Sequence, residues 1–415
     1  MQPRLDLSRP ATPVPAPPPA TLSEAEALDA LRLARSRNVG PSTWVRLVRR
    51  FGTPARALDA LPGLAGRGGA SGVTVASLAQ AERELGAGLS AGARLLVWDR
   101  PGYPEALARI PDPPPVLWVR GDPAALMRPA VAIVGARNAS AVGLRVARLL
   151  AAELGRKGLW TVSGLARGVD GAAHDAALSA AGDGGGTVAA VAGCVQAVYP
   201  SEHAELAGRI AQGGGAVVSE APIGLAPQGR HFPRRNRVIA GLSRAVILIE
   251  AAARSGSLIT AEFALEQGRE VLAVPGSPLD PRSEGGNALI RQGAALVRHA
   301  EDVIEALEAA AALPDLAPAL PEPEAAPDPE PGTPDAPGLA DPGAGFARPP
   351  LSAAQRDAAL RAQVRELLGL APVEEDELAR LSGAPLSALA DVLLELELAG
   401  RLDRRPGGLV ALLPE

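Results

Sequence analysis

The sequence has few cysteine, lysine and aromatic residues, and each shortage excludes a class of protein or shapes the core. A single cysteine, Cys194, excludes an intramolecular disulfide and a zinc cluster. It follows the apolar run TVAAVAG, so we expect a buried, unreactive side chain. Aromatic residues make up 2% of the chain, so alanine, valine and leucine must fill the core. No apolar run reaches the roughly 18 residues of a membrane span, so we expect a soluble, cytoplasmic protein.

Basic residues are also unusual, because Lys157 is the only lysine among 41 basic residues. We attribute this to coding bias, so the number of arginines alone is no evidence for DNA binding. The distribution of charge is more informative. Residues 1–130 and 131–300 carry net charges of +5 and +4, whereas residues 301–415 carry −14. A polyanionic ligand is therefore expected on the first two segments and not on the last.

The N-terminal part of the chain predicts an arm followed by a small helical module. Residues 1–20 are proline-rich and are expected to be a disordered arm rather than a signal peptide. Residues 21–90 have helical spacing, and Ser23 with Glu26 forms the pattern of a capping box. A glycine-proline turn at Gly40 separates two short helices, as in helix-hairpin-helix (SAM/HhH-like) modules that present backbone N–H groups to phosphate. A role in packing alone is the open alternative.

The C-terminal part predicts a linker and a winged helix. Residues 312–350 are rich in proline, alanine and acids and are expected to form an extended linker. Residues 351–415 predict three helices and a hairpin around Pro406, which is the order of a winged-helix module. Its recognition-helix region, residues 385–400, is acidic and has no arginine or lysine. We therefore expect it to dock on protein rather than to read a DNA groove.

The central segment, residues 91–311, alternates short apolar runs with helix-like stretches. Continuous apolar strands that alternate with helices predict a parallel sheet covered on both faces, a Rossmann-like doubly wound fold of the α/β class. Ligands of such sheets bind at the carboxyl ends of the strands. The predicted strands are residues 94–99, 116–121, 131–135, 159–164, 187–193, 215–220, 245–251, 269–276 and 294–299.

Three of the predicted strand ends have a similar composition. The first runs through GARNAS from Gly135, the second through SGLARG from Ser163, and the third reaches SGS at Ser255. Glycine allows close approach of the backbone, and the N-terminus of the following helix favours an anion. Arg137 and Arg167 add positive charge. Together these loops predict phosphate binding.

A basic stretch, RHFPRRNRVIAGLSR at residues 230–244, strengthens this prediction. We interpret Phe232-Pro233 as a turn before a helix on which Arg234 and Arg237 share a face. Arginine matches phosphate geometry, and an aromatic ring can stack on an unpaired base. The combination favours single-stranded nucleic acid; a solvated, basic helix start is the alternative.

Other motifs are missing or ambiguous. The sequence has no GxxxxGK[ST] and no GxGxxG, and no acid ends the second strand, which disfavours ATP hydrolysis and dinucleotide binding. Asp170 and His174 lie four residues apart and could form an acid–base pair, although capping and hydrogen bonding to the sheet are favoured. Glu250 and Glu262 could act on a glycosidic bond, or could anchor loops.

Several of these motifs resemble one known family. VAIVGARNAS, SGLARGVDGAAH, YPSEH, FPRRNRVIAGLS, SGSLITAEFALEQGREVLAVPG and GGNALIRQGA lie between Val131 and Ala294. They are similar to the DNA processing protein A (DprA/Smf) family, whose three-part layout the flanking modules fit more loosely. One departure is Val195-Gln196-Ala197, where the family usually has a glycine, an apolar residue and an aspartate.

The resemblance implies a protein without catalytic residues, metal or cofactor. Such a protein binds single-stranded DNA, protects incoming DNA during natural transformation, loads the RecA recombinase and dimerises through the Rossmann domain. It also implies that Arg137 and Arg167 contact phosphate, that Phe232 stacks on a base, and that residues 235–237 line the same pocket. The predicted DNA-binding residues are Gly135, Arg137, Ser163, Gly164, Arg167, Gly168, Arg230, Phe232, Arg235, Asn236, Arg237, Ser255, Gly256 and Ser257.

An enzyme is the alternative from another class. The sheet also resembles nucleotide-binding, lysine-decarboxylase-like proteins that cleave phosphoribosyl bonds. These carry the motif PGGxGTxxE, whereas the corresponding residues 253–262 read ARSGSLITAE and lack the double glycine. The binding protein is therefore favoured.

Overall fold

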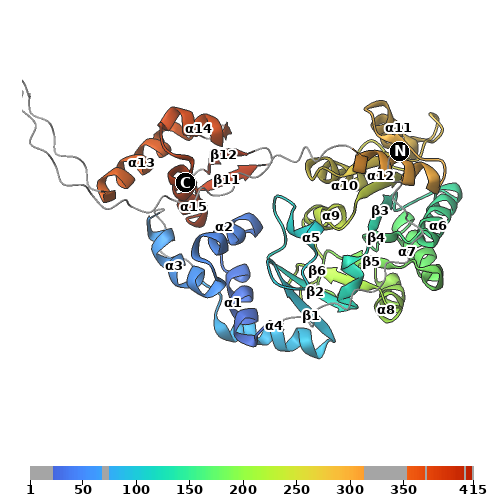
Figure 1. Ribbon diagram of the computed structural model, residues 1–415, viewed down its shortest axis with the longest axis horizontal. Coiled ribbons are helices and arrows are strands. Elements are labelled where there is room, and N and C mark those ends of the chain that lie inside the picture. Colours follow the sequence, from blue (N-terminus) through green and yellow to red (C-terminus); the bar gives the residue numbers. More distant parts are fainter. Residues whose placement is uncertain (1–21, 68–73, 313–352, 370–371, 406–407, 414–415) are drawn as a thin grey trace, which may run out of the picture. The chain divides into compact units, whose positions relative to one another are not determined.

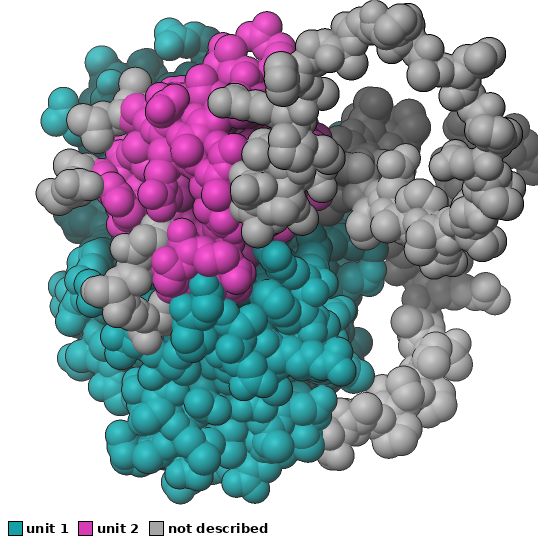
Figure 2. All heavy atoms as spheres, turned by 90° about the vertical axis from the view of Figure 1, so that its left-hand side faces the viewer, with its two compact units in different colours: residues 1–63, 72–313 teal, residues 64–71, 314–415 magenta. Residues whose placement is uncertain are grey.

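The computed structural model describes residues 22–67, 74–312, 353–369, 372–405 and 408–413. The chain forms two compact units, residues 1–63 with 72–313 and residues 64–71 with 314–415, which Figure 2 shows in separate colours. The predicted N-terminal arm and nearly all of the predicted linker lie outside the described residues.

The first unit begins with four helices: α1 (Glu24–Arg35), α2 (Pro41–Phe51), α3 (Pro54–Arg67, whose last residues group with the second unit) and α4 (Leu78–Ser90). The predicted capping box is confirmed at the start of α1. The Ser23 hydroxyl accepts a hydrogen bond from the Glu26 amide (3.3 Å), and the Glu26 carboxylate accepts one from the Ser23 amide (3.1 Å). Pro41 begins α2, where its missing N–H leaves no hydrogen bond unmade.

The central part of this unit is built on one sheet. In the described part of the chain, its nine strands follow the order β1-β2-β6-β5-β4-β3-β7-β8-β9. From β6 to β9 the neighbours pair in parallel, and β1 and β2 form an antiparallel edge. The chain reverses direction across the sheet between β3 and β7, which confirms the predicted doubly wound topology. The strands are β1 (Ala93–Val97), β2 (Val116–Gly121), β3 (Ala130–Gly135), β4 (Trp160–Ser163), β5 (Thr187–Ala190), β6 (Ala216–Ser219), β7 (Ala245–Ile249), β8 (Glu270–Ala273) and β9 (Ala295–Leu296).

Helices cover both faces of this sheet (Figure 1). One face carries α6 (Ala141–Arg156), α7 (Val169–Ser179), α8 (Ala204–Gln212) and α12 (Ala300–Ala312), and the other carries α9 (His231–Gly241) and α10 (Gly256–Glu266). The shorter helices are α5 (Glu105–Ala108), α11 (Glu284–Arg291) and the 3₁₀ turns η1 (Pro123–Met127), η2 (Ala181–Asp183), η3 (Ser201–His203) and η4 (Pro281–Ser283).

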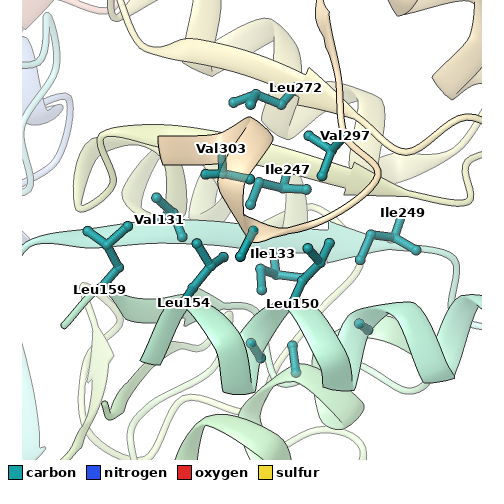
Figure 3. Close-up of a cluster of buried hydrophobic side chains, with 14 of the residues drawn as sticks. Val131, Ile133, Leu150, Leu154, Leu159, Ile247, Ile249, Leu272, Val297 and Val303 are labelled. Atoms are coloured by element: carbon teal, nitrogen blue, oxygen red, sulfur yellow. The ribbon is translucent and has the colours of Figure 1, made fainter. Parts of the chain in front are cut away.

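The core beneath α6 shows why the strands are continuously apolar. Val131 and Ile133 of β3 and Ile247 of β7 pack against Leu150 and Leu154 of α6 (Figure 3). Alternate residues of the same strands face the helices on the other side, so β4, β5, β6 and β7 are buried at every position. This double coverage leaves the loops at the strand ends as the accessible parts of the sheet.

The second unit has the order that the sequence predicted for a winged helix. It contains α13 (Ala353–Leu367), β10 (Val373–Glu374), α14 (Glu375–Ser382), α15 (Leu386–Leu398), β11 (Leu402–Arg405) and β12 (Leu409–Leu412). The strands form an antiparallel sheet in the order β10-β12-β11. Leu378, Leu393 and Val410 lie in its core. Residues 406–407 of the predicted hairpin turn lie outside the described residues.

A buried ion pair joins the helical module to the sheet within the first unit. The Glu84 carboxylate of α4 accepts hydrogen bonds from Arg35 Nε (3.0 Å) and Nη2 (2.8 Å) of α1 and from Trp118 Nε1 (2.9 Å) of β2. The Arg35 and Glu84 side chains are only 13% and 6% exposed. Gly88 of α4 lies directly against the Trp118 ring, where a Cβ would come within 2.2 Å. The helical module is therefore fixed to the sheet edge by specific contacts.

Replacing this carboxylate tests that description. Glu84→Ala leaves the Arg35 charge and the Trp118 N–H without their partner, and we expect it to lower the free energy of unfolding by about 3–5 kcal/mol. Urea unfolding followed by tryptophan fluorescence measures the change, because all four tryptophans lie in the first unit. The control is Glu105→Ala, which removes an exposed pair with Arg109 and should have little effect. Equal effects of the two substitutions would contradict the assignment.

Candidate nucleic-acid interface

An arginine–aromatic cluster lies where several strand ends meet. Arg137 follows β3, Tyr199 follows β5, and Phe232 lies in the first turn of α9 after β6. The Arg137 guanidinium carbon lies 5.3 Å from the centre of the Phe232 ring. The Tyr199 ring lies edge-on to the same ring, at 5.7 Å and 74°. Arg137 is exposed and Phe232 half-buried, so the cluster presents both positive charge and aromatic surface to solvent.

The loop after β4 packs directly against the loop after β3. Gly168 has φ +75°, and a Cβ on it would lie 2.2 Å from the Ala136 carbonyl oxygen. The next amide, Val169 N–H, donates to that same oxygen (3.2 Å). Only glycine combines this backbone conformation with so close an approach. Gly168 therefore holds the Arg167 loop beside the Arg137 loop.

Arg167 points into solvent but is not free. Its Nε and Nη2 donate to the two carboxylate oxygens of Glu202 at 2.7 and 2.8 Å. The hydrogen bonds with Glu202 raise the pKa of Arg167, and those with Arg167 lower the pKa of Glu202. Tyr199 also lies close enough to Arg167 to contribute electrostatically to the raised pKa of its guanidinium. Arg137, Arg167, Tyr199 and Phe232 thus belong to one edge of the sheet.

Arg235 supports this cluster from below. Its side chain is 6% exposed, and Nη1 donates to the carbonyls of Gly164 (2.6 Å) and Ala190, at the ends of β4 and β5. Its guanidinium carbon lies 5.9 Å from the Phe232 ring centre. Burial lowers the pKa of Arg235 to about 10, although the Asp170 carboxylate opposes the shift. Arg235 remains a cation at neutral pH and ties the first turn of α9 to two strands.

Asp170 and His174 have structural roles here, as favoured from the sequence. Asp170 Oδ2 accepts hydrogen bonds from the amides of Gly164 (3.1 Å) and Ala166 (3.4 Å). Burial raises the pKa of Asp170, and Arg235 opposes that shift. His174 Nδ1 bonds the Thr187 hydroxyl of β5 at 2.6 Å, and burial lowers its pKa to about 3. A neutral, buried imidazole on the sheet is no acid–base partner for a ligand.

The structure corrects the role of four predicted contact residues. The Arg237 side chain is 2% exposed; it pairs with Glu220 and with Asp112 (Nε to Oδ2, 3.2 Å). The shared face predicted for Arg234 and Arg237 is present, and both side chains pair with Glu220, although Arg234 stays exposed while Arg237 is buried. These buried bonds explain why Arg237 cannot line a surface pocket.

Asn236, Ser163 and Arg235 are corrected for the same reason. Asn236 is 8% exposed and donates from Nδ2 to the Gly256 carbonyl (3.1 Å). Ser163 is fully buried, and its hydroxyl donates to the Ile133 carbonyl (2.6 Å). Arg235 lies beneath the cluster. Each side chain already bonds the backbone of a neighbouring element, so each shapes the interface without reaching a ligand.

The start of α9 also differs from the prediction. The helix begins at His231, so Phe232 and Pro233 lie in its first turn rather than in a preceding loop. Arg230 is exposed at the N-cap position, and its Nε donates to His231 Nε2 at 3.4 Å. Burial lowers the pKa of His231, and the charges of Arg230 and Arg234 add to that shift. The exposed arginines at the start of α9 are therefore Arg230 and Arg234, and Arg244 is exposed at the other end of the basic stretch.

The strand end after β7 completes the edge. The Ser255 hydroxyl caps α10 by accepting from the Ser257 amide (3.3 Å), and Gly256 is exposed between them. Gly135 ends β3 so close to β7 that a Cβ would lie 1.8 Å from the Ile249 carbonyl oxygen. In the structure, the close backbone approach at Gly135 is thus to the neighbouring strand, and Ser255 caps a helix; their contact with phosphate stays a prediction.

A carboxylate occupies the switch point between β3 and β7. Glu250, with φ +50°, accepts from the Ser140 amide (2.8 Å) and from the Ser140 hydroxyl at the N-terminus of α6. In Rossmann folds that bind dinucleotides, the pyrophosphate lies at this helix terminus. The protein's own acid lies at that position, where its hydrogen bonds with Ser140 give Glu250 the loop-anchoring role that the sequence left open.

Sequence reasoning missed Tyr199 and Glu202 as parts of this edge. Both lie in the YPSEH motif, whose His203 Nδ1 bonds the Leu165 carbonyl at 2.9 Å. The motif itself was the available signal, since a tyrosine and an acid lie in the loop that follows the predicted strand at residues 187–193. Within the described ranges, no three His, Cys, Asp or Glu side chains are placed to hold a metal, and no helix is long and apolar enough to cross a bilayer.

The fold and this edge define a class: a three-part Rossmann-type protein with an exposed arginine–aromatic cluster suited to nucleic acid. Family models agree along the chain. The model described as DNA recombination-mediator protein A matches residues 94–308, the DprA-like N-terminal HHH domain matches 24–87, and the DprA winged helix domain matches 347–408.

Individual relatives give the same result. Protein Smf of Escherichia coli (strain K12) is 40% identical over 324 residues, 77% of each chain. DNA processing protein DprA of Bacillus subtilis (strain 168) is 47% identical over 206 residues, 49% of this chain and 68% of that protein. The X-ray structure of DprA from Streptococcus pneumoniae has a TM-score of 0.56 at 34% identity and covers 67% of this chain and 95% of that one. The chain belongs to the DprA/Smf family of DNA processing proteins.

The buried imidazole predicts how stability depends on pH. The folded pKa of His174, about 3, lies below its ordinary value of 6.5, so between these values the unfolded chain binds more protons than the folded one. The contribution of His174 to the free energy of unfolding is complete above about pH 6.5. It falls toward pH 3, by up to about 1.4 kcal/mol per pH unit. Urea midpoints measured across this range should therefore fall less steeply for His174→Gln, and equal slopes would contradict the assignment.

Proposed function

We propose that the protein binds single-stranded DNA at the carboxyl edge of its Rossmann-like sheet. The observation that carries the proposal is the exposed Arg137 guanidinium 5.3 Å from the ring centre of a half-buried Phe232. Arginine binds the phosphate, and the ring offers a stacking surface that only an unpaired base can reach. Arg230 and Arg254 are exposed at the adjoining strand ends and extend the positive surface.

We further propose that the bound strand is protected and then passed to RecA during natural transformation. The family's description as a recombination mediator supports this step, as do relatives named DNA processing proteins. In this proposal the protein acts in the cytoplasm as a homodimer formed through the Rossmann domain. RecA ATP hydrolysis on DNA already covered by a single-strand-binding protein tests it. The protein should restore hydrolysis, and no restoration would contradict loading.

Binding without turnover is part of the proposal. A phosphoribosyl-bond-cleaving enzyme would need an acid near this edge. The Glu250 carboxylate accepts a hydrogen bond from Ser140, and Glu262 is exposed on α10. Residues 253–262 lack the double glycine of that enzyme class. Incubation with nucleoside monophosphates separates the two functions, because release of free base would favour the enzyme.

Removing the Arg137 side chain tests its role in phosphate binding. Arg137→Ala should weaken binding to oligonucleotides of every sequence alike. It should also lower the slope of log K against log salt by about 0.7, because one fewer phosphate is neutralised on a single strand. Fluorescence anisotropy with a labelled oligonucleotide at several salt concentrations measures both quantities. The control is Arg83→Ala, on the exposed side of α4. An unchanged slope for Arg137→Ala would remove this residue from the site.

Removing the ring tests base stacking separately from charge. Phe232→Ala should weaken binding by about 1–3 kcal/mol while the salt slope stays nearly the same. Phe232→Tyr keeps an aromatic face and should retain most of the affinity. The same anisotropy titrations compare the three proteins, with urea midpoints to confirm that each is folded. If Phe232→Tyr were as weak as Phe232→Ala, stacking would not be the role of this side chain.

A further inference from the structure

We propose that Glu202 sets the affinity of this edge for DNA by competing with phosphate for Arg167. The inference rests on the proposed function and names the residue that regulates the same site. With no strand present, the Glu202 carboxylate occupies the Arg167 fork. A phosphate that binds Arg167 must displace the Glu202 carboxylate, so Arg167 becomes available to DNA only when this ion pair opens.

The geometry of the pair is that of phosphate recognition. Arg167 Nε and Nη2 reach the two Glu202 oxygens at 2.7 and 2.8 Å, two parallel bonds of the kind that arginine makes to phosphate. The carboxylate therefore uses the donors that a phosphodiester would use. Both side chains are more than half exposed, at 61% and 52%, so solvent weakens the pair and a polyanion can open it.

Glu202 is presented by an anchored turn. It lies in η3 (Ser201–His203), and His203 Nδ1 bonds the Leu165 carbonyl at 2.9 Å in the same loop that carries Arg167. The His203 ring also packs on Gly171 of α7, where a Cβ would come within 2.7 Å of it. At the other end of the turn, the Tyr199 ring contacts Phe232. The acid is thus held beside Arg167 by contacts on both sides.

Arg137 provides the contrast within the same edge. In the described part of the chain it forms no ion pair, and its guanidinium lies over the Phe232 ring. A strand can therefore bind Arg137 and Phe232 without breaking any ion pair, and engages Arg167 only by displacing Glu202. Beyond Glu202, a cleft between α6, α7 and α8 is lined by two further acids, Asp175 and Glu205, and by two arginines, Arg148 and Arg209, of which Arg209 pairs with Asp175 at 2.7 Å. Glu202 thus lies between the exposed Arg167 and a cleft of mixed charge.

A double-mutant cycle on the full-length chain tests this competition. Glu202→Gln removes the charge but keeps the size of the side chain, and should tighten binding to an oligothymidine about two- to fivefold, the range expected for releasing one exposed ion pair. In the Arg167→Ala background the same substitution should change affinity much less. Anisotropy titrations of the four proteins at one salt concentration give the coupling, and urea midpoints confirm that each is folded.

The matched control is Glu205→Gln, three residues further along the chain. Glu205 is exposed and, among the described residues, forms no ion pair, so its substitution makes the same change in net charge without releasing an arginine. It should leave affinity nearly constant in both backgrounds. Equal tightening by Glu202→Gln with and without Arg167, or tightening matched by Glu205→Gln, would overturn the competition and leave the proposed function standing. No binding by the unmodified protein would overturn both.

Discussion

The interface depends on one buried cation. Arg235 places its guanidinium against the carbonyls at the ends of β4 and β5, and together with the pairs that Arg234 and Arg237 form with Glu220 this contact joins the start of α9 to the sheet. Removing a charge from water is costly, and the lowered pKa of Arg235, about 10, reflects that cost. Asp170 and the two carbonyls offset it, so the side chain stays charged at neutral pH. Arg235 thus helps to hold the start of α9 at the strand ends and Phe232 in its position beside Arg137.

The remaining parts of the edge follow from how closely its loops approach one another. Gly168 lets the loop after β4 touch the loop after β3, and Gly164 leaves room for the Arg235 guanidinium, which a Cβ would meet at 2.6 Å. Glu250 fills the switch point where other Rossmann folds hold a pyrophosphate. Further along the same edge, the loops present charge and an aromatic ring. Function here is a property of the loops, and the sheet supplies their positions.

The fold could be predicted well because its signals are local. Strands such as Ala130–Gly135 are apolar throughout since both faces are covered, and Ser23 with Glu26 marks a helix start within four residues. The location of the proposed site follows from the rule that ligands lie at the carboxyl ends of parallel strands. The individual contacts were harder. The RRNR segment, residues 234–237, has the composition of a solvated surface. The burial of Arg237 is explained only by its partners Glu220 and Asp112, which lie elsewhere in the sequence.

Tyr199 and Glu202 were missed for a related reason, because each gains its role from a side chain on another loop. No periodicity or spacing within one segment shows such a pairing. The predictions that failed are thus those in which a charged residue bonds the interior, and those in which two loops combine their side chains. Both require the three-dimensional arrangement of the strand ends, which the pattern of a single segment does not contain.

The central claim is that unpaired bases stack at the Phe232 ring while phosphates bind the neighbouring arginines. Ultraviolet cross-linking of the full-length chain to an oligothymidine, followed by mass spectrometry of the cross-linked peptides, tests it most directly. The account predicts cross-links in the peptides that contain Phe232 or Tyr199, which lie in the same aromatic cluster. Cross-links confined to the helical module or to the winged helix, with none at these two residues, would contradict it.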